Sequence, residues 1–247
     1  MIRKLSITDI PQVARIHKQE LSGFLPELGL QFLENFYKAS LDIPEMFTLV
    51  EKKNEQILGF VSGIESAKGL YKKVIFKNPI GFAILFLRYF VTHPEKIVKM
   101  VKILSYPGFA DDSPELLTIA VKKDYQKRGI GKNLFQKTVE EFTKRKIKKF
   151  KISVYDKLPA NGFYKKIGCK FVNSFEFLGE KMNYYSYEIK ILNPKSQVPN
   201  KLTPRVIPSP SASLGINSVE GSLSLSKNDS RIRERSLHAL RLVGMTV

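Results

Sequence analysis

Residues 116–135 read LLTIAVKKDYQKRGIGKNLF, and the prediction of the fold starts from this stretch. It begins with a mostly apolar run that favours a buried strand, and it ends in the start of an amphipathic helix. Gly129 and Gly131 stand at the junction, where the missing Cβ atoms let a ligand approach the backbone and permit unusual φ/ψ values. The unpaired N–H groups of a first helical turn add partial positive charge. The stretch predicts a phosphate or pyrophosphate site held mainly by backbone amides.

Two common phosphate motifs do not fit these glycines. A P-loop requires a glycine five positions before Gly131, where this sequence has Gln126, and Asn133 stands where that motif has serine or threonine. The dinucleotide fingerprint requires a third glycine at the position of Leu134. The predicted phosphate site therefore matches neither the P-loop nor the dinucleotide-binding motif.

Another motif lies downstream, and the two motifs together resemble one family. Residues 160–172 read ANGFYKKIGCKFV. The stretch at 116–135 resembles the acyl-CoA-binding motif Q/R-x-x-G-x-G/A of the GNAT acetyltransferases, and residues 160–172 resemble their A-x-x-F-Y-x-x-x-G-F segment. Their order and the intervening helix and strand also fit, although Cys169 replaces the phenylalanine that follows Gly168. The resemblance covers roughly residues 1–192.

The patterns outside the two motifs alternate between strands and helices. Strands are expected at 2–7, 46–52, 56–66, 115–121, 150–155, 169–178 and 182–192, and helices at 8–21, 29–41, 129–146 and 158–168. Hairpins at both ends and a strand–helix–strand unit in the middle predict a mixed α/β domain. The resemblance implies the GNAT fold, with a mixed, mostly antiparallel central sheet flanked by helices.

Composition divides the chain into three regions. Residues 1–193 hold every aromatic residue and form the expected acetyltransferase domain. Between the third and fourth strands, residues 68–110 contain three prolines, an apolar helix candidate at 80–91 and an amphipathic one at 95–104, which predicts a helical insertion. Residues 194–247 contain many serines and prolines and no aromatic residue, so this tail is expected to be disordered.

The resemblance implies that acetyl-CoA binds as the acyl donor. Its pyrophosphate would lie at the glycine junction, and its pantetheine arm would pair with the preceding strand. The residues assigned to this binding are Ile119, Ala120, Val121, Gln126, Lys127, Arg128, Gly129, Ile130, Gly131, Lys132 and Asn161. The basic side chains among them also fit an ordinary solvated face, and Asn161 also fits a helix cap.

The resemblance also implies two catalytic residues. Tyr164 matches the family tyrosine whose hydroxyl lies near the thioester sulfur, and a phenol is a suitable general acid for a departing thiolate. Glu115, at the head of the fourth strand, is the candidate general base. The other carboxylates that remain open for this role are Glu20, Glu27, Asp111 and Asp112. The three histidines are scattered, so no metal site is expected.

The charge of the chain leaves several kinds of partner open. With 41 Lys and Arg against 23 Asp and Glu, the formal net charge is +18, which favours anionic partners or simply decorates the surface. No RRM, zinc-finger or helix-turn-helix pattern is found, so a nucleic-acid-binding module is disfavoured. The N-terminus shows no apolar signal region, and the apolar run at 80–87 is too short to span a membrane. A cytoplasmic protein is expected.

The sequence thus predicts an acetyl-CoA-dependent N-acetyltransferase acting on a primary amine. An amino sugar or another small amine is the favoured acceptor, and a protein N-terminus or lysine is the alternative. Peripheral membrane contact through residues 80–104 stays open, but packing of this segment on the core or over the acceptor site is preferred. The oligomeric state is not predicted.

Overall fold

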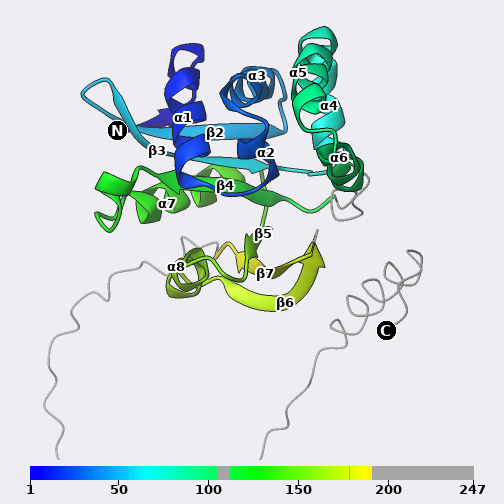
Figure 1. The fold of residues 1–247 in the computed structure, drawn as a ribbon. Coiled ribbons are helices and arrows are strands. Elements are labelled where there is room, and N and C mark those ends of the chain that lie inside the picture. Colours follow the sequence, from blue (N-terminus) through cyan, green and yellow to red (C-terminus); the bar gives the residue numbers. More distant parts are fainter. Residues whose placement is uncertain (105–111, 178, 191–247) are drawn as a thin grey trace, which may run out of the picture. The chain divides into compact units, whose positions relative to one another are not determined.

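A seven-stranded sheet forms the centre of the protein in the computed structural model, which describes residues 1–104, 112–177 and 179–190 (Figure 1). The strands are β1 (Ile2–Lys4), β2 (Met46–Lys53), β3 (Gln56–Ile64), β4 (Glu115–Val121), β5 (Lys149–Tyr155), β6 (Lys170–Phe177) and β7 (Glu180–Glu188). Their order across the sheet is β1-β2-β3-β4-β5-β7-β6, and only the β4–β5 pair is parallel. The predicted mixed, mostly antiparallel sheet is confirmed.

Helices cover both faces of this sheet. They are α1 (Ile10–Glu20), α2 (Phe24–Glu27), α3 (Leu30–Ser40), α4 (Leu70–Lys77), α5 (Pro79–Thr92), α6 (Lys96–Leu104), α7 (Ile130–Lys144) and α8 (Ala160–Lys166), with short 3₁₀ turns at Ile7–Asp9 and Lys123–Tyr125. Met1–Ile191 form one compact unit. The tail predicted at 194–247 and the candidate Asp111 lie outside the described residues.

Two hydrophobic cores lie on opposite faces of the sheet. Phe60 and Val61 are neighbours in β3, and because successive side chains of a strand alternate, they enter different cores. Phe60 packs with residues of α1 and α3, whereas Val61 packs with residues of α7, α8 and β5. Figure 1 shows α1 and α3 on one side of β2 and β3 and α7 on the other. The apolar stripes of these helices account for both layers.

The entry into α1 is fixed by a buried carboxylate. Asp9 accepts hydrogen bonds from the backbone N–H and the hydroxyl of Ser6, at 3.0 and 2.6 Å, and from the Arg3 guanidinium at 2.6 and 2.9 Å. Burial raises the pKa of the Asp9 carboxyl, but the bonds from Arg3 and Ser6 outweigh this effect and lower the pKa to about 2. Pro11 stands in the first turn of α1, as expected for a helix start.

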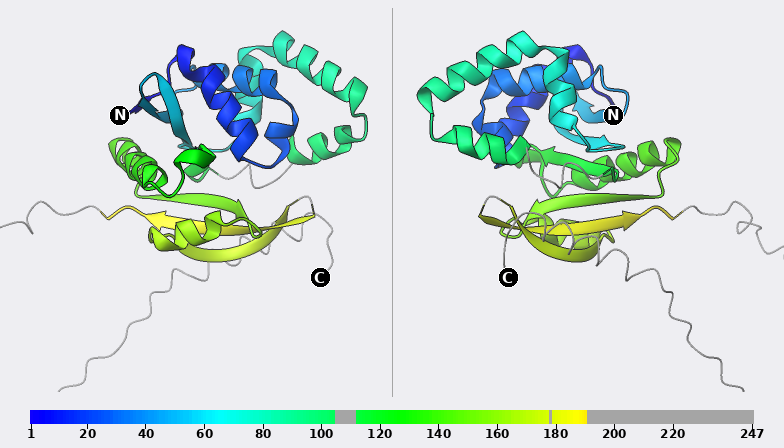
Figure 2. Two further views of the ribbon diagram at one scale, coloured as in Figure 1. Left: turned by 60° about the vertical axis from the view of Figure 1, so that its left-hand side comes forward. Right: turned by 90° about the vertical axis from the view of Figure 1, so that its right-hand side faces the viewer.

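Three helices form the segment between β3 and β4. The two helices expected from the sequence correspond to α5 and α6, whereas α4 was not predicted. Pro79 begins α5, and the side chain of Asn78 caps it by accepting the N–H of Gly81 at 3.1 Å. One face of α5 packs on α3, since the ring of Phe32 lies 5.3 Å from that of Phe82. Figure 2 shows α5 and α6 extending outward from this contact.

No helix in the described ranges is long and apolar enough to cross a membrane alone. The helices α4 and α5 reach that length and composition only as a pair, and a bend of 105° separates them.

Candidate active site

The strands β4 and β5 are paired only at their beginnings. The register joins Glu115 to Lys151 and Leu116 to Ile152, and no further β4–β5 pair is found in the described part of the chain. On its other side, β4 stays paired with β3 as far as Val121. Beyond Leu116, β4 therefore presents an edge without a strand partner, with backbone groups that an extended ligand can use. Ile119, Ala120 and Val121, predicted to contact the pantetheine arm, lie on this part of β4.

The glycine junction follows β4 and forms a cradle of backbone N–H groups. Lys127 and Gly129 both have positive φ values, +60° and +82°, and Gly129 is the left-handed N-cap of α7. The first hydrogen bond of α7 runs from the N–H of Asn133 to the carbonyl of Gly129. The N–H groups of Ile130, Gly131 and Lys132 find no acceptor among the described residues. A left-handed turn followed by free helical N–H groups is a typical anion site.

The basic side chains of the junction differ in their roles. The amide of Gln126 donates to the carbonyl of Val121 at 2.9 Å, so it fixes the loop rather than pointing freely to a ligand. The guanidinium of Arg128 lies over the ring of Tyr125, with 5.2 Å to the ring centre. Lys132 is exposed on the first turn of α7. The N–H groups, more than the side chains, are thus positioned for a diphosphate.

The loop between α1 and α2 spans the ends of the two separated strands. The carboxylate of Glu20 accepts the N–H of Lys123, which follows β4, at 2.9 Å. A Cβ atom added to Gly23 would lie 3.7 Å from the hydroxyl of Tyr155, the last residue of β5. This loop therefore crosses from the β4 side to the β5 side. The sequence left Glu20 open as a general base, but it gave no sign of the role of Tyr155.

Tyr164 lies beside the glycine junction. A Cβ atom added to Gly131 would lie 3.6 Å from the ring of Phe163, so α8 and the start of α7 are in contact. The ring of Tyr164 is buried, 5.3 Å from that of Phe163, and no hydrogen bond to its hydroxyl is found within the described ranges. Burial, with a smaller effect of Cys169, raises its pKa well above that of an ordinary tyrosine. The phenol therefore keeps its proton at neutral pH.

Glu115 forms a buried ion pair at the point where β4 and β5 begin to separate. Its carboxylate lies 3.6 Å from the ammonium of Lys151, and both residues are buried. Burial raises the pKa of the Tyr71 phenol, on α4, and the charge of Glu115 raises it further. Lys151 and Tyr71 were not identified from the sequence, since neither belongs to a motif.

Comparisons with known proteins agree with this geometry. Residues 93–191 match the family model described as an acetyltransferase (GNAT) domain. The chain therefore contains a GNAT acetyltransferase domain, as predicted. No curated protein matches the sequence. GNAT acetyltransferases use acetyl-CoA as the acyl donor, as predicted for this chain.

Solved structures show the same fold at low sequence identity. An N-acetyltransferase from Staphylococcus aureus Mu50 has a TM-score of 0.52 and 13% identity over 77% of this chain and 98% of that one. A ribosomal-protein-alanine N-acetyltransferase from Brucella melitensis has a TM-score of 0.51 and 16% identity over 76% and 99%. An aminoglycoside 6′-N-acetyltransferase complexed with coenzyme A has a TM-score of 0.52 and 12% identity over 78% and 99%. These similarities concern the fold.

Asn161 has a structural role in this GNAT domain. Its amide group donates to the carbonyls of Tyr155, Asp156 and Leu158 at 2.8 to 3.0 Å. Its side-chain oxygen accepts from the amide of Asn183 and the hydroxyl of Tyr185. Both donors and both lone pairs are therefore used within the protein. The predicted contact with acetyl-CoA would break one of these bonds, and the alternative helix cap is instead Pro159.

Among the described residues, Cys169 and His17 do not form a second reactive centre. Cys169 is buried in the core that contains Tyr164, and burial raises its pKa to about 12, so the thiol keeps its proton. His17 is buried and lies 2.6 Å from the hydroxyl of Tyr37. No cluster of metal-ligating side chains is found in the described part of the chain.

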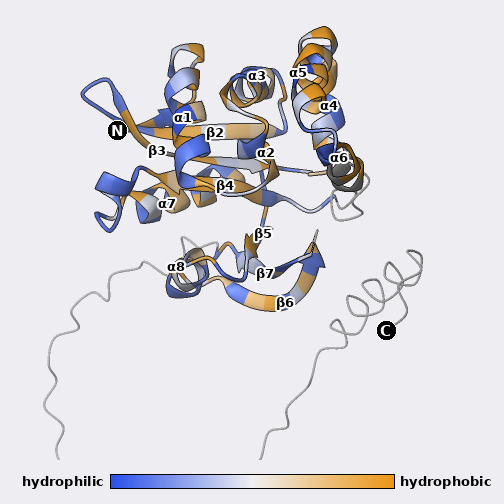
Figure 3. Ribbon diagram, in the orientation of Figure 1, coloured by the Kyte–Doolittle hydropathy of each residue, from blue (hydrophilic) through white to orange (hydrophobic). Residues whose placement is uncertain are grey.

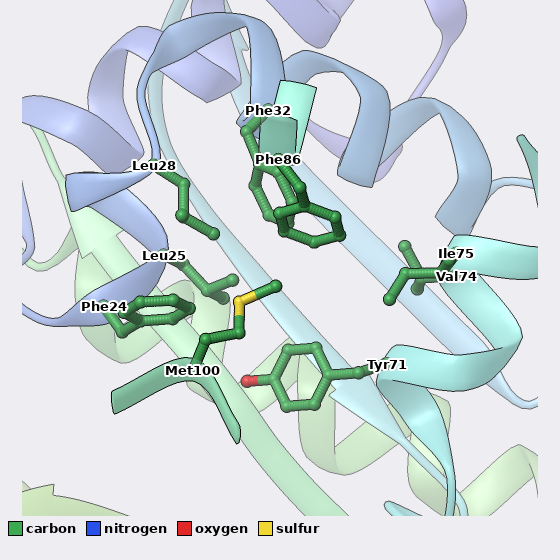
Figure 4. Close-up of a pocket in the computed structure, with 9 residues that line it drawn as sticks. All are labelled: Phe24, Leu25, Leu28, Phe32, Tyr71, Val74, Ile75, Phe86 and Met100. Atoms are coloured by element: carbon green, nitrogen blue, oxygen red, sulfur yellow. The ribbon is translucent and has the colours of Figure 1, made fainter. Parts of the chain in front are cut away.

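A small apolar pocket lies between the insertion and α2. Figure 4 shows its lining, which comes from α2 through α6: Phe24, Leu25, Leu28, Phe32, Tyr71, Val74, Ile75, Phe86 and Met100. Its interior measures about 10 Å³, the space of one water molecule. The insertion is therefore packed against α2 here, and the space is too small for a ligand larger than a water molecule.

Proposed function

We propose that this protein transfers the acetyl group of acetyl-CoA to the primary amine of a small cationic molecule, of which an amino sugar is one example. The observation that carries the proposal is the separation of β4 from β5 beside the free N–H groups of α7. The two features follow each other along the chain at Val121 and Gly129. A ligand with an extended arm and a diphosphate can bind both features, with its arm along the free edge of β4 and its diphosphate at the N–H groups of α7.

The donor is held mostly by main-chain groups. The free edge of Ile119–Val121 pairs with the amides of the pantetheine arm, and the N–H groups of Ile130, Gly131 and Lys132 donate hydrogen bonds to the diphosphate oxygens. The loop carrying Glu20 and Gly23 spans the two strand ends and covers the arm. This arrangement leaves the thioester near the place where β4 and β5 join.

The reaction needs one base and one acid. The amine nitrogen attacks the thioester carbonyl after its ammonium form has lost a proton to Glu115, directly or through water. The C–N bond forms, the C–S bond breaks, and the phenol of Tyr164 gives its proton to the departing sulfur. The nitrogen loses its second proton as the amide forms, and this proton returns through water to the phenolate of Tyr164. A backbone N–H near Val121 stabilises the oxyanion that forms in between. The raised pKa of Tyr164 suits this role, because the phenol must be protonated when the sulfur leaves.

Carboxylates around Tyr155 support a cationic acceptor. The pKa of the Tyr155 phenol is raised by burial first and then by the charge of Glu180, is lowered by Lys157, and is raised further by Glu27. Glu20 lies at the same strand ends, where it holds Lys123. Glu180 pairs with Lys157 at 2.6 Å and Glu27 with Lys96 at 3.9 Å, so an ammonium ligand would compete with these lysines for carboxylates near the site.

An amine screen tests the proposal. Release of free CoA from acetyl-CoA is measured with amino sugars, polyamines, other small amines, and peptides with free N-termini or lysines. We expect turnover with small cationic amines, and loss of it in Tyr164→Phe without loss of acetyl-CoA binding. Turnover with peptides alone would replace the small acceptor with a protein, an activity that the same fold serves in the Brucella melitensis enzyme. Undiminished turnover by Tyr164→Phe would remove the assigned acid.

A further inference from the structure

The helix α5 is apolar on two opposite faces, and only one of them is covered. Phe82 and Phe86 face α3, where both rings lie within 5.5 Å of the ring of Phe32. The opposite face carries Ile80, Ile84, Leu87 and Val91, which are exposed by 74, 60, 68 and 74%. These four residues follow the spacing i, i+4, i+7, i+11, so they share a stripe about 60° wide along the helix. We call them the α5 ridge.

The ridge is part of a larger apolar surface on the insertion. Phe76 at the end of α4, and Val98 and Val101 on α6, are exposed by 77, 61 and 56%. In Figure 3, the hydrophobic colour runs along α5 at the margin of the domain. Single exposed aliphatic side chains are common, but a continuous row on one helix is not, and such rows mark sites of association. A row of this kind on the α5 ridge is expected to be covered by a partner.

The charges of the same segment identify the kind of partner. Residues 68–104 contain eight Lys and Arg and one acidic residue, Glu95. Lys72, Lys77 and Arg88 are exposed, and Arg88 is next to Leu87 of the ridge. Cores of protein interfaces are depleted in lysine. A helix with large apolar side chains and basic neighbours is instead suited to the headgroup region of an anionic bilayer.

We propose that the α5 ridge docks this protein on the surface of a membrane that contains anionic phospholipids. The helix lies in the interface with its ridge toward the acyl chains, while Phe82 and Phe86 keep it attached to α3. Fourteen helical residues are about 21 Å long, too short to cross a bilayer core of about 30 Å.

Co-sedimentation of the full chain with vesicles tests this docking. We expect binding to vesicles of phosphatidylcholine with phosphatidylserine, weaker binding to phosphatidylcholine alone, and loss of the difference at high salt. The double variant Ile84→Asp, Leu87→Asp should bind at least about tenfold more weakly, because the charges would enter the acyl region. The matched control is Ile7→Asp, an isoleucine exposed by 61% outside the insertion, which should bind like the wild type.

A second pair of variants tests the basic residues. Lys77→Gln with Arg88→Gln should weaken binding about fivefold for each charge removed. Lys144→Gln with Lys148→Gln removes the same charge near the end of α7 and should have little effect. Thermal unfolding must show that all variants are folded, which the exposure of these side chains leads us to expect. The proposal is overturned if the wild type binds neither vesicle at low salt, or if the ridge variant binds as the wild type does. A protein partner would replace the lipid if the ridge variant broke a dimer while vesicles were not bound.

Discussion

Replacing Gly131 by alanine should separate the stability of the domain from its binding of acetyl-CoA. Gly131 lies in the first turn of α7 with ordinary helical geometry, and its added Cβ would contact Phe163 at 3.6 Å and Val121 at 3.9 Å, which are normal packing distances. Alanine also has the higher helix propensity, so the free energy of unfolding should stay the same or rise by up to about 1 kcal/mol. Nothing in the protein alone opposes the methyl group.

The same methyl group would stand between β4 and α8, on the path assigned to the carrier. It would keep the diphosphate away from the N–H groups of the first turn, and each lost hydrogen bond to a charged group costs about 1.5–3 kcal/mol. The dissociation constant of acetyl-CoA should therefore rise about 10- to 100-fold. Titration calorimetry measures this change, and thermal unfolding without ligand measures the stability.

Two further glycines serve as controls. Gly129 has φ +82° with open space around its Cβ position, so Gly129→Ala should lower the free energy of unfolding by about 1–2 kcal/mol through the left-handed backbone and should also weaken binding. Gly69 is the left-handed N-cap of α4 and is equally unhindered, so Gly69→Ala should cost as much stability without affecting acetyl-CoA. If Gly131→Ala binds acetyl-CoA as tightly as the wild type, the diphosphate is not held at this junction.

Three other results are expected. Tyr164→Phe should lower kcat by about 100-fold or more with little change in acetyl-CoA affinity, and because burial raises the tyrosine pKa, wild-type kcat should not fall with rising pH until above the ordinary tyrosine range. Glu115→Gln should lower both kcat and stability, because it leaves the buried ammonium of Lys151 without its carboxylate partner. The double variant Glu115→Gln, Lys151→Gln should recover the stability but not kcat. Recovery of both would show that Glu115 has only a structural role. Burial lowers the pKa of His17 to about 4, so between about pH 4 and 6.5 the unfolded chain binds a proton that the folded chain does not. The free energy of unfolding should therefore be highest above about pH 6.5 and fall by up to about 3 kcal/mol toward pH 4. Denaturant titrations at several pH values should show that a His17→Gln variant loses this dependence.

The donor half of the site could be predicted from the sequence because its signals are local. The strand expected at 115–121 has those bounds in the structure, and the helix begins at the glycines as expected. Glycine spacing at a strand-to-helix junction is read along the chain, and so is the motif around Tyr164. The left-handed conformation of Lys127 carried no such signal, since lysine rarely adopts it.

The remaining features depend on contacts between distant segments. The pairing of Glu115 with Lys151 follows from the register of β4 against β5, which no short pattern specifies. The position of β7 between β5 and β6 is set by tertiary packing in the same way. Asn161 lies within a motif, but its five hydrogen bonds join it to two segments, residues 155–158 and 183–185, so its sequence context could not distinguish a ligand role from a structural one.

The two sides of β4 explain how one strand can hold a ligand in a fixed place. Toward β3 the packing is tight, because a Cβ atom on Gly59 would lie 2.7 Å from the carbonyl of Ala120 and 3.2 Å from the side chain of Leu134. Only glycine fits at position 59, and this close contact fixes the positions of β4 and α7 relative to β3. Toward β5 the strand is free beyond Leu116. The same residues are thus rigidly placed from one side and open from the other, which prepares their backbone groups for a ligand before it arrives.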